Sequence, residues 1–195
     1  MSGPPIIFGA TSIRAILAGT KTQTRRIAKP ARGLTVHDLI ANGERIMTET
    51  ESGFMCSRDQ LAPCRFEVGD RLWVREAFAW PNDQVTIYRA NWRQDAEARG
   101  MDNIPSNDSE IRWRSPLFMP RKLSRITLEI TDIRVERLQE ISEADALAEG
   151  CVPGDFDDIG TPKAIFAALW EHINGSGAWD ENPWVWALTF RRVER

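Results

Sequence analysis

A nine-residue segment at 18–26, AGTKTQTRR, combines hydroxyl groups with cations and contains no acid. Its threonines and cations could form a small polar site built around an anion or a hydroxyl nucleophile, because a threonine hydroxyl becomes nucleophilic when an adjacent base takes its proton. Arg25 and Arg26 would surround these groups with positive charge. A solvent-exposed basic strand edge has the same composition, so the segment alone does not decide between the two interpretations.

The spacing of Lys21 and Thr24 places a requirement on the backbone. Side chains alternate along an extended strand, so residues three positions apart point to opposite faces. A site that uses both residues therefore predicts a turn or a bulge within 20–25. A flat strand there would argue against the site.

Hydrophobic patterning and helix caps predict the elements around this segment. Helices are expected over 11–19, ending at a left-handed Gly19, over 141–150 with Ser142 as N-cap, and over 161–175 with Pro162 in the first turn. Strands are expected at 5–8, 69–78, 85–90, 124–138 (one bent strand or two) and 182–193, and a loop at 93–110. These strands and short helices predict an α+β fold, most simply a small β-barrel with helices at its ends and loop insertions.

Length and composition predict one soluble domain over 1–195, with insertions near 31–66 and 91–111. The sequence contains neither a run of about 18 apolar residues nor a signal peptide, which predicts a cytoplasmic protein that does not contact membranes. Its cysteines and histidines match no common zinc spacing, so no metal or other cofactor is expected. These residues are Cys56, Cys64, Cys151, His37 and His172.

Charge is distributed unevenly along the chain. The net charge of −3 argues against a protein whose whole surface binds nucleic acid. Nevertheless, no acid precedes Asp38, and the segment before it carries +6. Positive potential is therefore expected around 18–26.

Four segments in this order, GTKTQTRR, VGDRLWVRE, LQEISEADALAEG and PWVWALTF, resemble the ASCH-domain family, which has a PUA-like β-barrel. The longer members found in phages and prophages are the most similar. The resemblance spans nearly the whole chain except 31–66 and 91–111. Small bacterial members hydrolyse N(4)-acetylcytidine to cytidine and acetate, and related enzymes take other N(4)-acylated cytosines.

The resemblance implies a small-molecule substrate and a catalytic group of Lys21, Thr24 and Glu149. Arg26 closes the family element, whereas Arg25 stands where smaller relatives often have an apolar residue. Both arginines are candidate substrate-binding residues. Trp73, Arg75 and Glu76 follow a Gly-Asp turn and are further candidates for lining the pocket.

Two chemical assignments are consistent with these residues. In the first, Lys21 is the base for Thr24, and Glu149 orients the lysine and passes protons to the leaving amine. A lysine accepts a proton only when neutral, a form that neighbouring arginines favour and a carboxylate disfavours. In the second, Glu149 is the base, acting on water or on Thr24, and a charged Lys21 stabilises the oxyanion. The sequence does not choose, although Thr24 as nucleophile beside Lys21 is preferred.

A binding function is the alternative to an enzyme. PUA-like domains commonly bind RNA, and the basic segment before Asp38 would suit RNA or single-stranded nucleic acid. RNA cleavage has also been proposed within the family. The acidic overall charge and the few aromatic residues near the basic segment favour a small substrate over a long strand.

Overall fold

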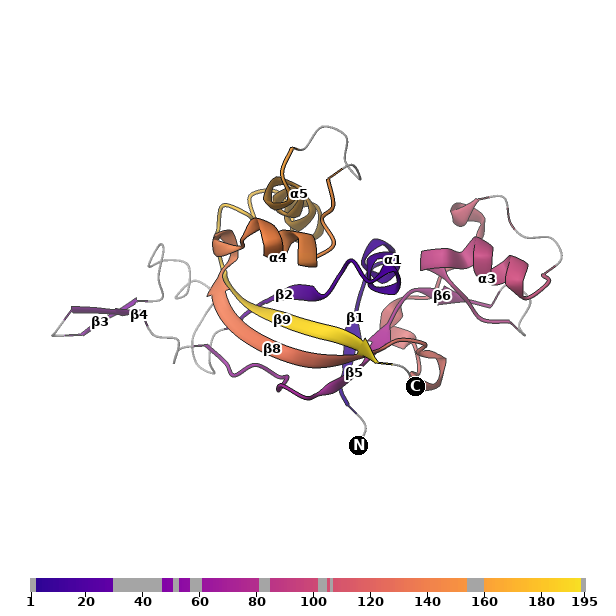
Figure 1. Cartoon of the computed structure of the whole chain (residues 1–195), viewed down its shortest axis with the longest axis horizontal. Coiled ribbons are helices and arrows are strands. Elements are labelled where there is room, and N and C mark those ends of the chain that lie inside the picture. The colour runs from indigo at the N-terminus through magenta and orange to yellow at the C-terminus, as the bar shows by residue number, and fades with distance from the viewer. Residues whose placement is uncertain are drawn as a thin grey trace. The chain divides into compact units, whose positions relative to one another are not determined.

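The computed structural model describes residues 3–29, 47–50, 53–56, 61–80, 85–101, 105, 107–153 and 160–193. Five of the described strands form one sheet in the order β1-β5-β8-β9-β2, in which β8 and β9 are long, curved neighbours (Figure 1). These strands are β1 (Pro5–Ile7), β5 (Arg71–Arg75), β8 (Thr127–Arg137), β9 (Trp184–Val193) and β2 (Gln23–Ile27). Two further antiparallel pairs of described strands are β3 (Met47–Thr50) with β4 (Gly53–Cys56), and β6 (Phe78–Ala79) with β7 (Ile87–Tyr88).

The described α-helices are α1 (Ala10–Ala18), α3 (Trp92–Ala98), α4 (Glu143–Ala148) and α5 (Pro162–Asn174). Short 3₁₀ turns are η2 (Arg89–Asn91), η3 (Asp108–Glu110), η4 (Pro116–Phe118), η5 (Arg121–Leu123) and η6 (Leu138–Glu140). None of these helices is long and apolar enough to cross a membrane. The predicted α+β class is confirmed.

Pairing within the sheet is mixed. β1 runs parallel to β5, whereas β5 pairs with β8 and β2 pairs with β9 in antiparallel register. The order of the described strands has two ends, β1 and β2, so they form an open sheet rather than a closed barrel.

The chain folds into two compact units. Unit 1 comprises 1–22, 68–130 and 190–195, and unit 2 comprises 23–67 and 131–189. Most of the expected insertion at 31–66 lies outside the described residues. The single domain over 1–195 stays a prediction.

Three helix boundaries lie where local sequence signals predicted them. Gly19 follows α1 with φ of 79°, a left-handed conformation that glycine adopts without a Cβ clash. The Ser142 hydroxyl accepts a hydrogen bond from the Asp145 backbone N–H at 3.0 Å and so caps α4. Pro162 occupies the first turn of α5. These predictions are confirmed.

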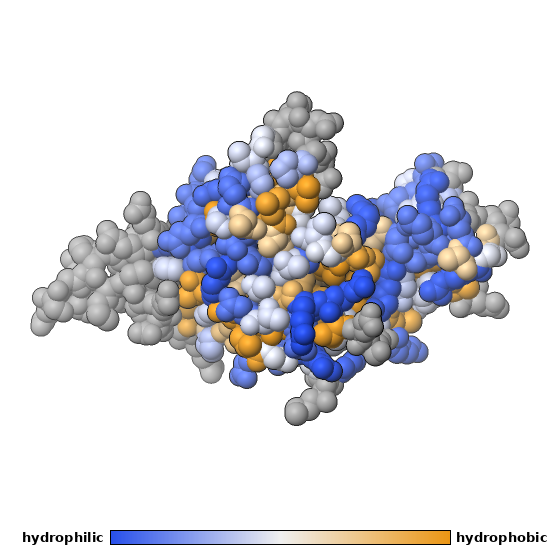
Figure 2. All heavy atoms as spheres, in the orientation of Figure 1, coloured by the Kyte–Doolittle hydropathy of each residue, from blue (hydrophilic) through white to orange (hydrophobic). Residues whose placement is uncertain are grey.

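The prediction of a loop over 93–110 is wrong for its first part, because α3 extends from Trp92 to Ala98. Trp92 and Ala96, four residues apart, are buried on one helix face, and Trp92 packs with Ile111 in a cluster of unit 1. Arg93, Gln94 and Glu97 are exposed, and hydrophilic residues dominate the visible surface of the α3 region (Figure 2). Tertiary packing, rather than local pattern, therefore stabilises α3.

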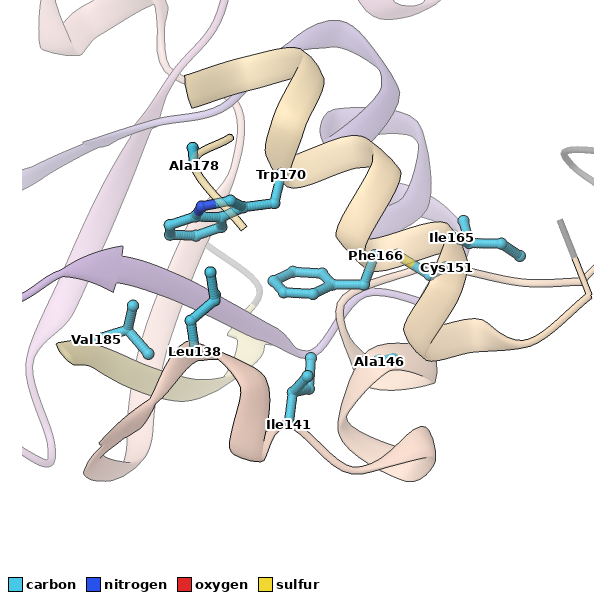
Figure 3. Packing of buried hydrophobic residues seen from close by; sticks show 9 residues of the cluster. All are labelled: Leu138, Ile141, Ala146, Cys151, Ile165, Phe166, Trp170, Ala178 and Val185. Atoms are coloured by element: carbon cyan, nitrogen blue, oxygen red, sulfur yellow. The ribbon is translucent and has the colours of Figure 1, made fainter. Parts of the chain in front are cut away.

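A nine-residue apolar cluster forms the main core of unit 2. Phe166 and Trp170 extend from α5 toward Leu138 and Val185 (Figure 3). The remaining members are Ile141, Ala146, Cys151, Ile165 and Ala178. α4 and α5 pack against each other above this cluster, which positions the end of α4.

Two isoleucines on α5 provide a matched test of this core. Ile165 is 1% exposed and Ile173 is 67% exposed. We expect Ile165→Ala to lower the free energy of unfolding by about 2–5 kcal/mol because it leaves a cavity. Ile173→Ala should change it by less than about 0.5 kcal/mol. Denaturant titration measures both, and equal effects would contradict the packing.

Candidate functional site

β2 places its side chains alternately on two faces, and hydrogen bonds between residues two apart identify each face. On one face, Arg25 Nη1 donates to Gln23 Oε1 at 3.2 Å. On the other, Arg26 Nη1 donates to Thr24 Oγ1 at 2.8 Å. The strand pairs regularly with β9 from Gln23 to Ile27. Thr24 and Arg25, both predicted site residues, therefore point to opposite faces.

The Arg25 guanidinium lies at the centre of three carboxylates. Its Nε and Nη2 both donate to Glu136 Oε1, at 2.9 and 2.7 Å, and its Nη1 donates to Glu149 Oε1 at 3.3 Å. Asp145 Oδ2 is 3.5 Å from Nη2. The Arg25 side chain is 0% exposed, so these groups replace the water that a guanidinium otherwise requires. The cluster connects β2 with β8 and α4.

A second cation completes the charge balance around Asp145. Arg134 Nη2 donates to Asp145 Oδ1 at 3.1 Å, and Gln23 Nε2 donates to the same oxygen at 2.8 Å. Burial acts to raise the pKa of Asp145, but hydrogen bonds with Gln23 and Ser142 and the charge of Arg134 outweigh burial. The pKa of Asp145 therefore lies below its usual value, and the carboxylate form is favoured.

Sequence reasoning missed Glu136 and Asp145. Glu136 is 111 residues from Arg25 along the chain, so no local pattern connects the two. The available signal was compositional, because residues 131–189 contain 12 acidic and 3 basic residues. A strand with two consecutive arginines needs such partners if it is buried.

Thr24 and Arg26 form a separate pair on the opposite face of β2. Thr24 is 2% exposed, and its oxygen accepts the 2.8 Å hydrogen bond from a cation. A guanidinium at this distance stabilises negative charge that develops on the oxygen. Burial lowers the pKa of Arg26, and the negative charge of Glu149 acts in the opposite direction. The Arg26 guanidinium thus donates a hydrogen bond to Thr24 and is attracted by the negative charge of Glu149.

Glu149 occupies the C-cap of α4, where it is 6% exposed. Gly150 follows with φ of 88° and ends the helix. A carboxylate at a helix C-terminus is disfavoured by the helix dipole. Its pairing with Arg25 offsets this disadvantage and gives the predicted catalytic glutamate a defined position.

Lys21 belongs to unit 1, whereas Thr24, Arg25, Arg26 and Glu149 belong to unit 2. Lys21 is 4% exposed, and its backbone N–H donates to Ala15 O at 3.1 Å as the chain leaves α1. The regular strand starts only at Gln23. The requirement that Lys21 and Thr24 share one face stays a prediction.

The other candidates, Trp73, Arg75 and Glu76, also belong to unit 1. The Arg75 guanidinium lies 4.6 Å from the centre of the Trp73 ring. Glu76 is 2% exposed and accepts two hydrogen bonds from Arg125, at 2.8 and 2.9 Å. Burial raises the pKa of Glu76, and Arg125 opposes this shift.

Arg125 contacts Glu76 with two nitrogens and lies 4.1 Å from the centre of the Tyr88 ring. This second polar cluster is therefore held together within unit 1. Among the residues that the structure describes, no group of three or more histidine, cysteine or acidic side chains is arranged to hold a metal ion.

Removal of the Arg25 guanidinium should destabilise the protein strongly. We expect Arg25→Met to lower the free energy of unfolding by about 3–5 kcal/mol, because the substitution leaves buried carboxylates without their cation. Arg134 contacts the same cluster but is 44% exposed. Arg134→Met should therefore cost less than about 1 kcal/mol. Urea titration compares the two, and a small effect of Arg25→Met would contradict the cluster.

Asp145 gives a prediction for pH. Because its folded-state pKa is depressed, ionised Asp145 contributes stability above its unfolded pKa of about 3.9, and the contribution is lost as pH falls through the folded value. Asp145→Asn should destabilise the protein by about 1.5–3 kcal/mol at pH 7. The difference from wild type should shrink below about pH 4. A difference in unfolding free energy that is constant with pH would exclude this role.

Comparison with models of protein families, with curated proteins and with solved structures finds no match to this chain. The resemblance to the ASCH-domain family therefore rests on the four sequence segments and their order.

Proposed function

We propose that the protein is an amidohydrolase that cleaves N(4)-acylated cytosine or cytidine to the free base or nucleoside and a carboxylic acid. The environment of the Thr24 hydroxyl supports this proposal most strongly. Thr24 presents a buried hydroxyl whose oxygen accepts a hydrogen bond from Arg26, in a unit that also positions Glu149. The ASCH-like order of segments supplies the substrate class.

The proposed reaction proceeds in two steps. The Thr24 oxygen attacks the acyl carbonyl carbon while its proton passes to a base, and the resulting oxyanion is stabilised by neighbouring cations. Collapse breaks the bond between the carbonyl carbon and N4, and the leaving amine takes up a proton. Water then attacks the acyl-threonine ester, which releases the carboxylate and restores the hydroxyl. The net change is amide plus water to amine plus acid.

Arg26 and Arg25 have different roles in this scheme. Arg26 contacts the nucleophilic oxygen directly and lowers the energy of its deprotonated form. Arg25 holds Glu149 through a 3.3 Å contact and does not share the face of Thr24. Arg25 is therefore a positioning residue, and its unusual presence in the family element is explained by the carboxylates that surround it.

Either Lys21 or Glu149 could be the base that takes the proton of Thr24. Glu149 already accepts a hydrogen bond from buried Arg25 at 3.3 Å, and this engagement of the carboxylate favours Lys21 as the base. Thr24 is 2% exposed, so covering side chains must move aside when substrate enters.

Thr24→Ala should reduce kcat/KM for N(4)-acetylcytidine by at least about 10³-fold, because the nucleophile is lost. Thr22→Ala is the matched control, since Thr22 is exposed and lies outside β2. A spectrophotometric assay of cytidine release, repeated with N(4)-acetylcytosine, measures both variants. Full activity of Thr24→Ala would contradict the assignment, and no hydrolysis of either substrate by wild type would contradict the proposed function.

The same assay separates the two assignments of the base. Arginine keeps the positive charge but does not accept a proton at neutral pH. If Lys21 is the base, Lys21→Arg should be inactive. Substantial activity in Lys21→Arg would instead identify Lys21 as the charged partner of the oxyanion.

A further inference from the structure

A groove of about 540 Å³ lies in unit 1, apart from every residue of the proposed catalytic group in sequence. Its walls combine aromatic rings with guanidinium groups. The lining residues are Trp80, Arg112, Trp113, Arg114, Ser115 and Phe118. We call this feature the aromatic groove.

Two tryptophans of the aromatic groove are fixed by their indole N–H groups. Trp80 Nε1 donates to Thr86 Oγ1 at 2.8 Å, and Trp113 Nε1 donates to the Asp108 carbonyl at 3.1 Å. The backbone between them is also paired, since Arg114 N donates to Phe78 O at 2.8 Å. The rings are therefore held in place before any ligand binds, which lowers the entropy lost on binding.

The rim of the aromatic groove exposes apolar surface. Phe118 is 76% exposed and neighbouring Leu117 is 62% exposed, both on η4. The Ser115 hydroxyl accepts a hydrogen bond from the Leu117 N–H at 3.3 Å and so caps this turn. An exposed phenylalanine on a capped turn beside two anchored tryptophans offers a stacking surface for a planar group.

Cations surround this stacking surface. Residues 111–124 contain four basic residues and no acid. The Arg114 guanidinium stacks 4.7 Å from the centre of the Trp80 ring, which leaves its N–H edge available. Within the described ranges, neither Arg112 nor Arg114 has a carboxylate at ion-pair distance. The groove therefore presents N–H donors for an anion.

Unit 1 as a whole has the charge of an anion-binding surface. Its residues include 15 basic and 10 acidic side chains, a net charge of +5. Unit 2 includes 10 basic and 18 acidic side chains, a net charge of −8. The modest net charge of the chain thus conceals a basic unit and an acidic one, and the aromatic groove lies in the basic unit.

We propose that the aromatic groove binds single-stranded nucleic acid, with bases stacked on Phe118 and the tryptophans and phosphates paired with Arg112 and Arg114. Stacking on aromatic rings combined with cations along the backbone is the general mode of single-strand binding. A duplex keeps its base faces covered and offers nothing for Phe118 to stack on. An apolar protein segment would leave the arginines without partners, and a small anion would not use the exposed ring.

Fluorescence anisotropy with labelled twelve-nucleotide single-stranded RNA, single-stranded DNA and a duplex tests this site. We expect a single strand to bind with an affinity that falls with salt, by about 0.7 log unit per log unit of salt for each phosphate neutralised. Arg112→Gln combined with Arg114→Gln should weaken binding and lower that slope by roughly 1.4. Phe118→Ala should weaken binding at least about fivefold but leave the slope unchanged.

Two exposed residues of unit 1 outside the groove provide matched controls. Arg99→Gln removes one charge, and Val68→Ala removes exposed apolar surface. Both should bind as wild type does. Comparison of the RNA and DNA arms identifies which strand is preferred, and competition by cytidine monophosphate shows whether a single nucleotide suffices.

No binding of either single strand at low salt would overturn the proposal, as would groove variants that bind like the controls. Equal affinity for the duplex would also overturn it, because stacking would then play no part. The catalytic proposal is tested separately. Thr24→Ala should retain strand binding, and the groove variants should retain hydrolysis of N(4)-acetylcytidine.

Discussion

A buried guanidinium constrains the arrangement of unit 2. Arg25 has no exposed side-chain surface, so its charge must be balanced by groups that the fold brings to it. Glu136 from β8 and Glu149 from the end of α4 supply that balance, together with Asp145. Because these residues come from separate elements, the ion cluster defines how β2, β8 and α4 fit together. Apolar packing alone is less selective among similar arrangements.

The same constraint separates two functions along one short strand. Gln23 and Arg25 face the carboxylates, and alternation then directs Thr24 and Arg26 to the other face. One face carries the ion cluster of Arg25. On the other, the Thr24 hydroxyl accepts a hydrogen bond from Arg26. The end of α4 connects the two, since Glu149 contacts Arg25 and its charge acts on Arg26. This connection explains how a structural ion cluster supports the proposed chemistry.

The predictable parts of the fold were those with local causes. Gly19, Ser142 and Pro162 end or begin helices through interactions with residues at most a few positions away. α3 was missed because the burial of Trp92 depends on residues distant in sequence, including Ile111. The acidic partners of Arg25 were missed for the same reason. Thr24 and Glu149 were identified only through the resemblance, because neither has an individual sequence signal.

If Thr24 is the nucleophile, it carries the acyl group between the two steps of the proposed reaction, and this acyl-enzyme can be detected. Wild-type protein would be mixed with N(4)-acetylcytidine, quenched in acid during the first turnover, digested and analysed by mass spectrometry. We expect an acetyl group on the peptide that contains Thr24, at the residue itself, and its disappearance as acetate is released. Cytidine release in the first turnover with no acetyl group on Thr24 at any time would contradict it.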